Sequence, residues 1–311
     1  MSSGARSHTA PPEPDRPPVS LPRLAEMKAN GEPIVMVTAY DYPSARVAEA
    51  AGVDIVLVGD SAANVVLGYA GTEPVTMEEM IVLGKAVRRG LRTPLMVGDL
   101  PMGSYEASNE TAIRSAQRLV KETGCQAVKL EAGGVMVERA RAIIRSGIPV
   151  MGHVGLTPQT ATALGGYKAQ GRSARGAIKL FEEALALQSV GCFAVVFEAV
   201  PAAVMEAIAD RLETITIGIG AGPATDGQVL VFHDLLGITT GRTAKFVKRY
   251  ADLHAEMVAA VRRFGEEVRG GAFPAAEHVY GIEPAELDGL RRYLEQESLD
   301  SRQAWDWEPL V

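Results

Sequence analysis

Five short apolar segments of the sequence end in side chains that can do acid–base or metal chemistry. The segments finish in Asp60, in Asp99, in Lys129 with Glu131, in His153 and in Glu198. One charge at the end of a strand is usually a solvated loop residue or a helix cap. Charges buried together cost several kcal/mol each unless they are paired or bind a metal. The series therefore predicts a functional site.

Three of these side chains are carboxylates, Asp60, Asp99 and Glu131, with one histidine and no cysteine in the series. Ligands that are all oxygen suit a hard cation such as Mg²⁺, which binds through few carboxylates and keeps some of its waters. Like charges held close together repel and take up protons, and a divalent ion relieves both effects. The types predict an Mg²⁺ site at Asp60, Asp99 and Glu131.

Lys129 and Glu131 stand two residues apart in the segment "AVKLEAGG". Side chains alternate between the faces of a strand, so these two point the same way. Lys129 can form a salt bridge with the acids, or it can hold the carboxylate of an anionic substrate. A lysine–glutamate pair made only for stability is the remaining interpretation.

Glu198 follows the apolar residues "VVF", a setting that should raise its pKa and suit it to act as a general base. His153 can contact substrate or orient a carboxylate, and a histidine satisfied inside the core is the alternative. A metal ion stabilises the enolate that forms when a hydrogen beside a carbonyl is removed. The set favours proton abstraction next to a carbonyl, followed by carbon–carbon bond chemistry.

Side chains at strand ends meet only if the strands share a sheet. Eight apolar runs alternate with segments of helical period, at 34–41, 55–61, 94–100, 127–131, 149–155, 194–200, 214–222 and 228–232. Near-continuous apolar runs are typical of parallel strands covered on both sides. The pattern predicts a (β/α)8 TIM barrel, whose enzymes have their sites at the carboxyl ends of the strands. A doubly wound open sheet is the alternative.

Helix signals separate these runs. Thr76 with Glu79 has the spacing of a capping box and opens a helix that closes at Gly90. Similar signals predict helices over 108–124 and 173–191, and further helices after residue 240 that close the barrel or pack on a neighbour.

Composition bounds the class of protein. The chain has 311 residues, 47% of them hydrophobic, and a net charge of -7, which argues against a general nucleic-acid binder. Cys125 and Cys192 make no disulfide framework and are expected to be buried thiols in a reducing cytosol. No apolar stretch is long enough to cross a bilayer. A cytoplasmic enzyme acting on small molecules, with no nucleic-acid or membrane partner, is expected.

The two ends of the chain are polar. The first 20 residues, rich in proline and serine, are expected to form a disordered leader. Residues 21–280 are expected to form the catalytic barrel with its C-terminal helices. Residues 281–311 form an extension of unknown role, in which Trp305 and Trp307 could pack on the body or on a partner.

Other motifs carry less information. "GIGAG" at 218–222 lacks the lysine of a P-loop and follows the seventh strand, so a strand-end turn is the preferred reading. The glycine-rich segment 165–172 is either a mobile flap or a surface loop. His233 and Asp234 are expected to form a structural hydrogen-bonded pair.

An ordered set of motifs closely resembles the ketopantoate hydroxymethyltransferase family. The set is "VTAYDYPSA", "LVGDSAANVVLGY", "GDLPMGSYE", "AVKLEAGG", "GHVGLTPQT", "GGYKAQGR", "FEAVP" and "IGIGAGPATDGQVLVFHDLLGI". The resemblance runs from about residue 20 to about residue 280. It implies a barrel of the phosphoenolpyruvate/pyruvate superfamily, assembled as a homodecamer of two pentamers.

The resemblance also implies a reaction in pantothenate biosynthesis. A hydroxymethyl group passes from 5,10-methylenetetrahydrofolate to 3-methyl-2-oxobutanoate through an enolate, giving 2-dehydropantoate. Matching motif positions place Mg²⁺ at Asp60, Asp99 and Glu131, the keto acid at Asp60, Ser61, Asp99 and Lys129, and the proton acceptor at Glu198.

The chain departs from the family's pattern at two positions. Met102 and Ala199 stand where phenylalanine and a cysteine or methionine are common, so local packing there can differ. A carbon–carbon lyase or phosphonate mutase on a related barrel is the alternative enzyme, although the "KKCGH"-like motif of isocitrate lyases is absent. A non-catalytic keto-acid-binding protein is the alternative from another class.

Overall fold

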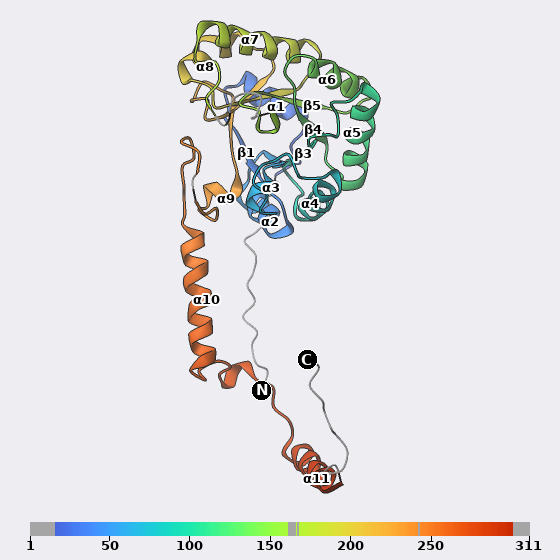
Figure 1. Cartoon of the computed structure of the whole chain (residues 1–311), viewed down its shortest axis with the longest axis vertical. Helices are drawn as coiled ribbons and strands as arrows, with labels where there is room; N and C mark the ends of the chain where they lie inside the picture. The colour runs from blue at the N-terminus through green and yellow to red at the C-terminus, as the bar shows by residue number, and fades with distance from the viewer. Residues whose placement is uncertain (1–15, 161–165, 167, 242, 301–311) are drawn as a thin grey trace. The chain divides into compact units, whose positions relative to one another are not determined.

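The computed structural model describes residues 16–160, 166, 168–241 and 243–300. Eight parallel strands close into a barrel in which each strand pairs with the next and the last pairs with the first (Figure 1). The strands are β1 Ile34–Thr38, β2 Ile55–Val58, β3 Leu95–Asp99, β4 Ala127–Glu131, β5 Val150–Gly155, β6 Ala194–Glu198, β7 Ile215–Ile219 and β8 Gly227–Leu230. The predicted (β/α)8 barrel is confirmed, and the open sheet is wrong.

The strands are apolar on both faces because they border two cores. Alternate residues such as Leu57, Val97 and Met151 fill the interior of the barrel. The residues between them, such as Val56 and Val128, pack outward against the helices. Burial on both faces explains the near-continuous apolar runs.

The same alternation fixes where the charged side chains point. Asp99 continues the inward series of Leu95 and Val97, and Lys129 continues that of Ala127. Two-residue steps likewise aim Glu131, His153 and Glu198 at the interior. These groups therefore lie at one rim of the barrel, at the carboxyl ends of the strands.

Helices surround the strands and connect them (Figure 1). In the barrel unit they are α1 Leu21–Ala29, α2 Tyr42–Ala51, α3 Ala62–Val65, α4 Met77–Gly90, α5 Asn109–Thr123, α6 Met136–Arg145, α7 Ala174–Ser189, α8 Ala202–Ile208 and α9 Phe232–Leu235, with short 3-10 turns η1 Pro158–Thr160 and η2 Ala209–Arg211. The predicted capping box of α4 is present, since Thr76 N–H donates to Glu79 at 2.8 Å and Glu79 N–H donates to Thr76 at 3.2 Å. Ser108 caps α5, which ends at Gly124 in the left-handed conformation.

Most of the predicted leader, residues 1–15, lies outside the described residues. Its last residues contact the barrel, because Val19 is buried and its N–H donates to the carbonyl of Thr93 at 2.8 Å. Arg16 forms an ion pair with Asp54 at 3.4 Å. The described chain is thus already attached to the barrel before α1.

The chain divides into two compact units, residues 1–254 and 255–311. The second unit contains most of α10 Leu253–Arg269, the 3-10 turn η3 Ala276–His278 and α11 Pro284–Asp300. No side chain of α10 is buried. The domain boundary expected after residue 280 and the role of the C-terminal helices stay predictions. Trp305 and Trp307 lie outside the described residues.

Candidate active site

A buried ion pair lies at the carboxyl ends of β3 and β4. Asp99 and Lys129 are register partners on these strands, and Lys129 Nζ lies 3.0 Å from Asp99 Oδ1. The two side chains are 0% and 5% exposed. The backbone N–H of Asp60, just beyond β2, donates to Asp99 Oδ2 at 3.0 Å. These contacts connect the ends of β2, β3 and β4. Of the interpretations given for Lys129, the structure shows the salt bridge with an acid.

Gln159, in the η1 turn after β5, connects the other two acids. Its Nε2 donates to Asp60 Oδ2 at 2.9 Å, and its backbone N–H donates to Glu131 Oε1 at 3.1 Å. Glu131 Oε2 is buried and has no hydrogen-bond partner among the described residues. One carboxylate oxygen of this buried group is left unsatisfied.

Burial and mutual repulsion strongly shift the pKa values of two of these acids. Burial raises the pKa of Glu131 to about 9, with Asp60 adding to the rise and Lys129 opposing it. Burial likewise raises the pKa of Asp99 to about 7, against the effect of Lys129. Burial alone would lower the pKa of Lys129, but Asp99, Asp60 and Glu131 reverse this and the net shift is upward. The lysine is charged, whereas Glu131 in the metal-free protein keeps its proton at pH 7.

His153 and Glu198 form a second pair, on β5 and β6. His153 Nε2 lies 3.3 Å from Glu198 Oε2, and both ring nitrogens of His153 are buried without a hydrogen-bond partner in the described chain. Burial, aided by Lys129, lowers the pKa of His153, so the imidazole is neutral at pH 7. The setting of Glu198 is less apolar than predicted, because it has this polar neighbour and its side chain is 15% exposed.

Tyr40 places Ser61 at the same rim. The Tyr40 hydroxyl lies 2.8 Å from Ser61 Oγ, and burial raises the pKa of Tyr40. The ring of His233 lies 5.4 Å from that of Tyr40, centroid to centroid. His233 Nδ1 has no hydrogen-bond partner in the described chain, so the hydrogen-bonded pair predicted for His233 and Asp234 is not formed.

The donor set suits a hard divalent cation. Three carboxylates and one ammonium leave two negative charges when all are ionised, and Glu131 Oε2 is an orphaned acceptor. The residues present therefore fit Mg²⁺ in charge and in donor type. In the described chain, however, no three His, Cys, Asp or Glu side chains already stand together as metal ligands. Lys129 and Gln159 occupy oxygens that an ion would otherwise share, so the three-carboxylate site stays a prediction.

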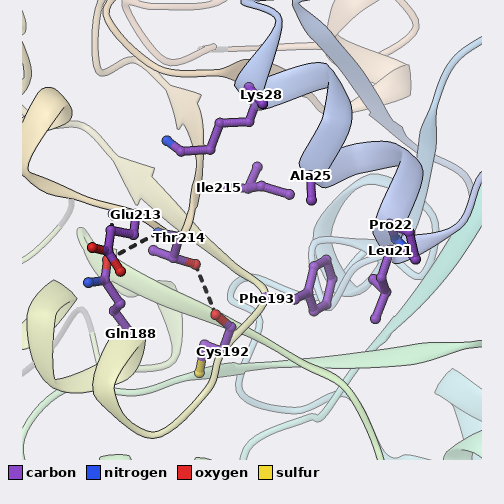
Figure 2. Close-up of a pocket in the computed structure, with 11 residues that line it drawn as sticks. Leu21, Pro22, Ala25, Lys28, Gln188, Cys192, Phe193, Glu213, Thr214 and Ile215 are labelled. Carbon is purple, nitrogen blue, oxygen red and sulfur yellow. Dashed lines mark hydrogen bonds between the residues drawn. The ribbon is translucent and has the colours of Figure 1, made fainter.

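The opposite end of the barrel has a hollow of different character (Figure 2). Leu21 and Ala25 of α1 line it together with Phe193 and Ile215, which stand at the amino ends of β6 and β7. Its polar groups are largely paired within the protein, as Gln188 Oε1 accepts from the backbone N–H groups of Glu213 and Thr214. None of the predicted site residues lines it.

The sequence of the chain that carries this site is strongly similar to those of one enzyme family. The family model for ketopantoate hydroxymethyltransferase matches residues 18–276. The chain belongs to this family. Its 3-methyl-2-oxobutanoate hydroxymethyltransferase relatives include one from Deinococcus radiodurans, 52% identical over 87% of this chain and 96% of that protein. One from Moorella thermoacetica is 53% identical over 84% of this chain and 97% of that protein.

Two solved structures are similar to this chain in fold alone. A phosphoenolpyruvate phosphomutase from Streptomyces platensis subsp. rosaceus has a TM-score of 0.53 at 16% identity, covering 90% of this chain and 99% of that one. A 2,3-dimethylmalate lyase described as a PEP mutase/isocitrate lyase superfamily member has a TM-score of 0.53 at 16% identity, covering 91% and 99%. The predicted barrel fold and the family membership are both confirmed.

The structure brings the predicted site residues to one rim but adds residues that the motifs did not single out. Gln159 and Tyr105 both contact this set, and both lie within quoted motifs, "GHVGLTPQT" and "GDLPMGSYE". A glutamine four residues past a strand end would have been found by asking which side chains share the rim. Gly165 and Tyr167 of the glycine-rich segment 165–172 lie outside the described residues, and its role as a flap or a surface loop stays a prediction.

Two further expectations have structural outcomes. Cys125 and Cys192 are free and buried, as predicted, and burial raises the pKa of both thiols. Among the helices of the described chain, none combines the length and the apolar character needed to cross a bilayer.

Proposed function

We propose that this chain transfers a hydroxymethyl group from 5,10-methylenetetrahydrofolate to 3-methyl-2-oxobutanoate, giving 2-dehydropantoate, with Mg²⁺ as its metal. Family membership supports the reaction. The single structural observation that supports it is the rim itself, where buried acids and Lys129 lie on one side and a carboxylate lies beside a neutral histidine on the other.

Asp60 and Asp99 are proposed as the residues that hold Mg²⁺ directly. The backbone N–H of Asp60 donates to Asp99, and the charge of Asp60 contributes to the raised pKa of Asp99, so the two acids lie close together. Glu131 would then act through water or through its free Oε2, because Gln159 holds Oε1. When bound, the cation supplies positive charge that makes a hydrogen beside a carbonyl more acidic. Few direct ligands agree with the preference of Mg²⁺ for retained water and substrate oxygens.

Lys129 and Ser61 are proposed to bind the keto acid beside these carboxylates. The Lys129 ammonium is charged and nearly buried, so an anionic carboxylate gains strongly from contact with it. Tyr40 holds the Ser61 hydroxyl at the same rim. Together these groups orient the substrate and exclude water around it.

Glu198 is proposed to remove the hydrogen from C3 of the keto acid. The C3–H bond breaks, the proton passes to a Glu198 carboxylate oxygen, and the electron pair is shared with the carbonyl as an enolate. His153 is proposed to orient Glu198, because its Nε2 lies 3.3 Å from Glu198 Oε2 and its ring is neutral. C3 then bonds to the one-carbon unit, and water supplies the hydroxyl oxygen as tetrahydrofolate leaves.

Exchange in heavy water tests the first step without the folate. With Mg²⁺, the protein should exchange the C3 hydrogen of 3-methyl-2-oxobutanoate for deuterium, followed by proton NMR. Adding 5,10-methylenetetrahydrofolate should then yield 2-dehydropantoate by mass spectrometry. Folded protein that gives neither exchange nor product would refute the proposal.

The same assay separates the alternatives. A non-catalytic binding protein would bind the keto acid in a calorimetric titration and show no exchange. A lyase or phosphonate mutase would act on its own substrates and form no 2-dehydropantoate. A cytoplasmic location and a decamer of two pentamers are proposed from the family resemblance, and sedimentation of the purified chain tests the decamer.

A further inference from the structure

The side chain of Gln159 makes three hydrogen bonds at the rim. Its Nε2 donates to Asp60 Oδ2 at 2.9 Å and to the carbonyl of Leu100 at 3.1 Å. Its Oε1 accepts from the Tyr105 hydroxyl at 2.7 Å. Gln159 is only 4% exposed, so these bonds are made away from water.

The orientation of the amide is fixed by the chemistry of its neighbours. Asp60 Oδ2 and the Leu100 carbonyl are acceptors only, so a reversed amide would face both with its own oxygen. Two buried acceptor pairs would be left without a proton, which is costly. Tyr105 must then donate to Oε1, and this bond holds the amide in the one productive orientation.

Gln159 engages one oxygen of each of two acids and leaves the other oxygen free. Its side chain holds Oδ2 of Asp60, and its backbone N–H holds Oε1 of Glu131. Oε2 of Glu131 remains a buried atom with no hydrogen-bond partner in the described chain. Without these donors each carboxylate could rotate and present either oxygen.

We propose that Gln159, locked by Tyr105, is a positioning residue that selects which oxygens of Asp60 and Glu131 face the bound cation and substrate. This inference rests on the proposed metal-dependent function and adds a residue that positions the proposed metal ligands. Outer groups that orient metal ligands typically change metal affinity by about 10- to 100-fold when they are removed.

Gln159→Met removes the amide while keeping similar volume and the backbone N–H that holds Glu131. Binding of Mg²⁺ is measured by calorimetry and binding of Mn²⁺ by electron paramagnetic resonance, with no folate present. We expect dissociation constants at least about 10-fold higher than those of the unmodified chain. The KM for the keto acid at fixed Mg²⁺ should rise more than kcat falls.

Thr160→Val is the matched control. Thr160 lies in the same turn, is exposed, and bonds Thr157 without contacting an acid. Its substitution should leave metal binding within about twofold. Unchanged metal binding in folded Gln159→Met would overturn the inference, since a purely structural glutamine would alter only thermal stability.

Tyr105→Phe provides a second test if Gln159→Met fails to fold. It keeps the ring and removes the hydroxyl, and we expect metal binding about 3- to 10-fold weaker. In the double variant the second substitution should add little, because Tyr105 acts through Gln159. Full additivity, or Tyr105→Phe that binds metal as the unmodified chain does, would overturn it. An unmodified chain that binds neither Mg²⁺ nor Mn²⁺ would instead refute the proposed metal site itself.

Discussion

The two ends of the barrel are built from the same eight strands and have opposite chemistry. At the carboxyl end, Asp99 and Lys129 are buried beside two more acids. At the amino end, α1 covers the strands with Leu24 and Met27, and Lys28 pairs with Asp226 where both are about a fifth exposed. Charge is partly hydrated at one end and almost fully dehydrated at the other. In barrel enzymes such a division separates function from stability.

The largest expected effect is the loss of activity in Glu198→Gln. An amide cannot accept the proton, so C3 exchange and turnover should fall by about 10²- to 10⁴-fold. Keto-acid binding, measured by calorimetry with Mg²⁺, should stay within about threefold. The control is Glu213→Gln at the amino end, an exposed carboxylate whose loss should leave both rates unchanged. Exchange at the normal rate in Glu198→Gln would remove the general base from the mechanism.

The next effect contrasts the lysines of the two ends. Lys129→Met leaves the buried acids without their cation, and we expect about 3–5 kcal/mol less stability in urea unfolding at pH 7 without metal. Lys28→Met should cost no more than about 1 kcal/mol. Asp226 keeps its bonds from the N–H and hydroxyl of Thr216. Equal losses from the two variants would show that the ends do not differ in the way described.

At the amino end the expected effect is on stability alone. Leu24 is 0% exposed in the inner core, so Leu24→Ala should cost about 2–4 kcal/mol of unfolding free energy. Turnover per folded molecule should not change, because α1 contacts β1 and β7, which carry none of the proposed site residues. A lower kcat at full folding would mean that the amino end is coupled to the rim.

The acids predict a smaller effect of pH. Glu131 is raised from 4.5 to about 9, so the folded state holds a proton that the unfolded state releases above pH 4.5. Its contribution to the stability of the metal-free protein is therefore present below pH 4.5 and is lost as pH rises toward 9. Mg²⁺ favours the ionised acid, so its affinity should rise by up to about tenfold per pH unit between pH 7 and 9. Calorimetry in buffers of different ionisation enthalpy should detect the released proton, and a flat profile would contradict this assignment.

Local sequence signals were sufficient for the strands and for the charges that end them. A parallel strand in a barrel is apolar on both faces, so each run stands out from its flanking helices. Because side chains two residues apart on a strand point to the same face, Asp99, Lys129 and Glu131 point into the barrel. Eight such runs leave few topologies besides a closed barrel.

The contacts that complete the site depend on tertiary structure. Gln159 meets Asp60 across 99 residues of chain, and no periodicity marks a glutamine in a short turn. The pairing of His153 with Glu198 likewise depends on the register of β5 and β6. The same dependence made the expected hydrogen bond between His233 and Asp234 wrong, because adjacency in sequence does not decide which group a ring faces.

The smallest effect concerns the turn after Glu198, which holds the proposed base in place. Ala199 has φ of 51°, the left-handed region, and is the one such residue besides glycine in the described chain. Its N–H donates to Ile219 at 2.9 Å and its carbonyl accepts from Gln170 at 3.0 Å, so both sides of the turn are tied. Ala199→Gly removes the strain of the left-handed conformation but increases the conformational entropy of the unfolded chain. The unfolding free energy should therefore change by less than about 1 kcal/mol, and exchange activity should be retained. Ala199→Val keeps a side chain that resists this conformation and should lower both stability and exchange. Equal stability and exchange activity in the valine and glycine variants would show that this turn does not position Glu198 relative to His153. The position of Glu198 would then be determined by the strands.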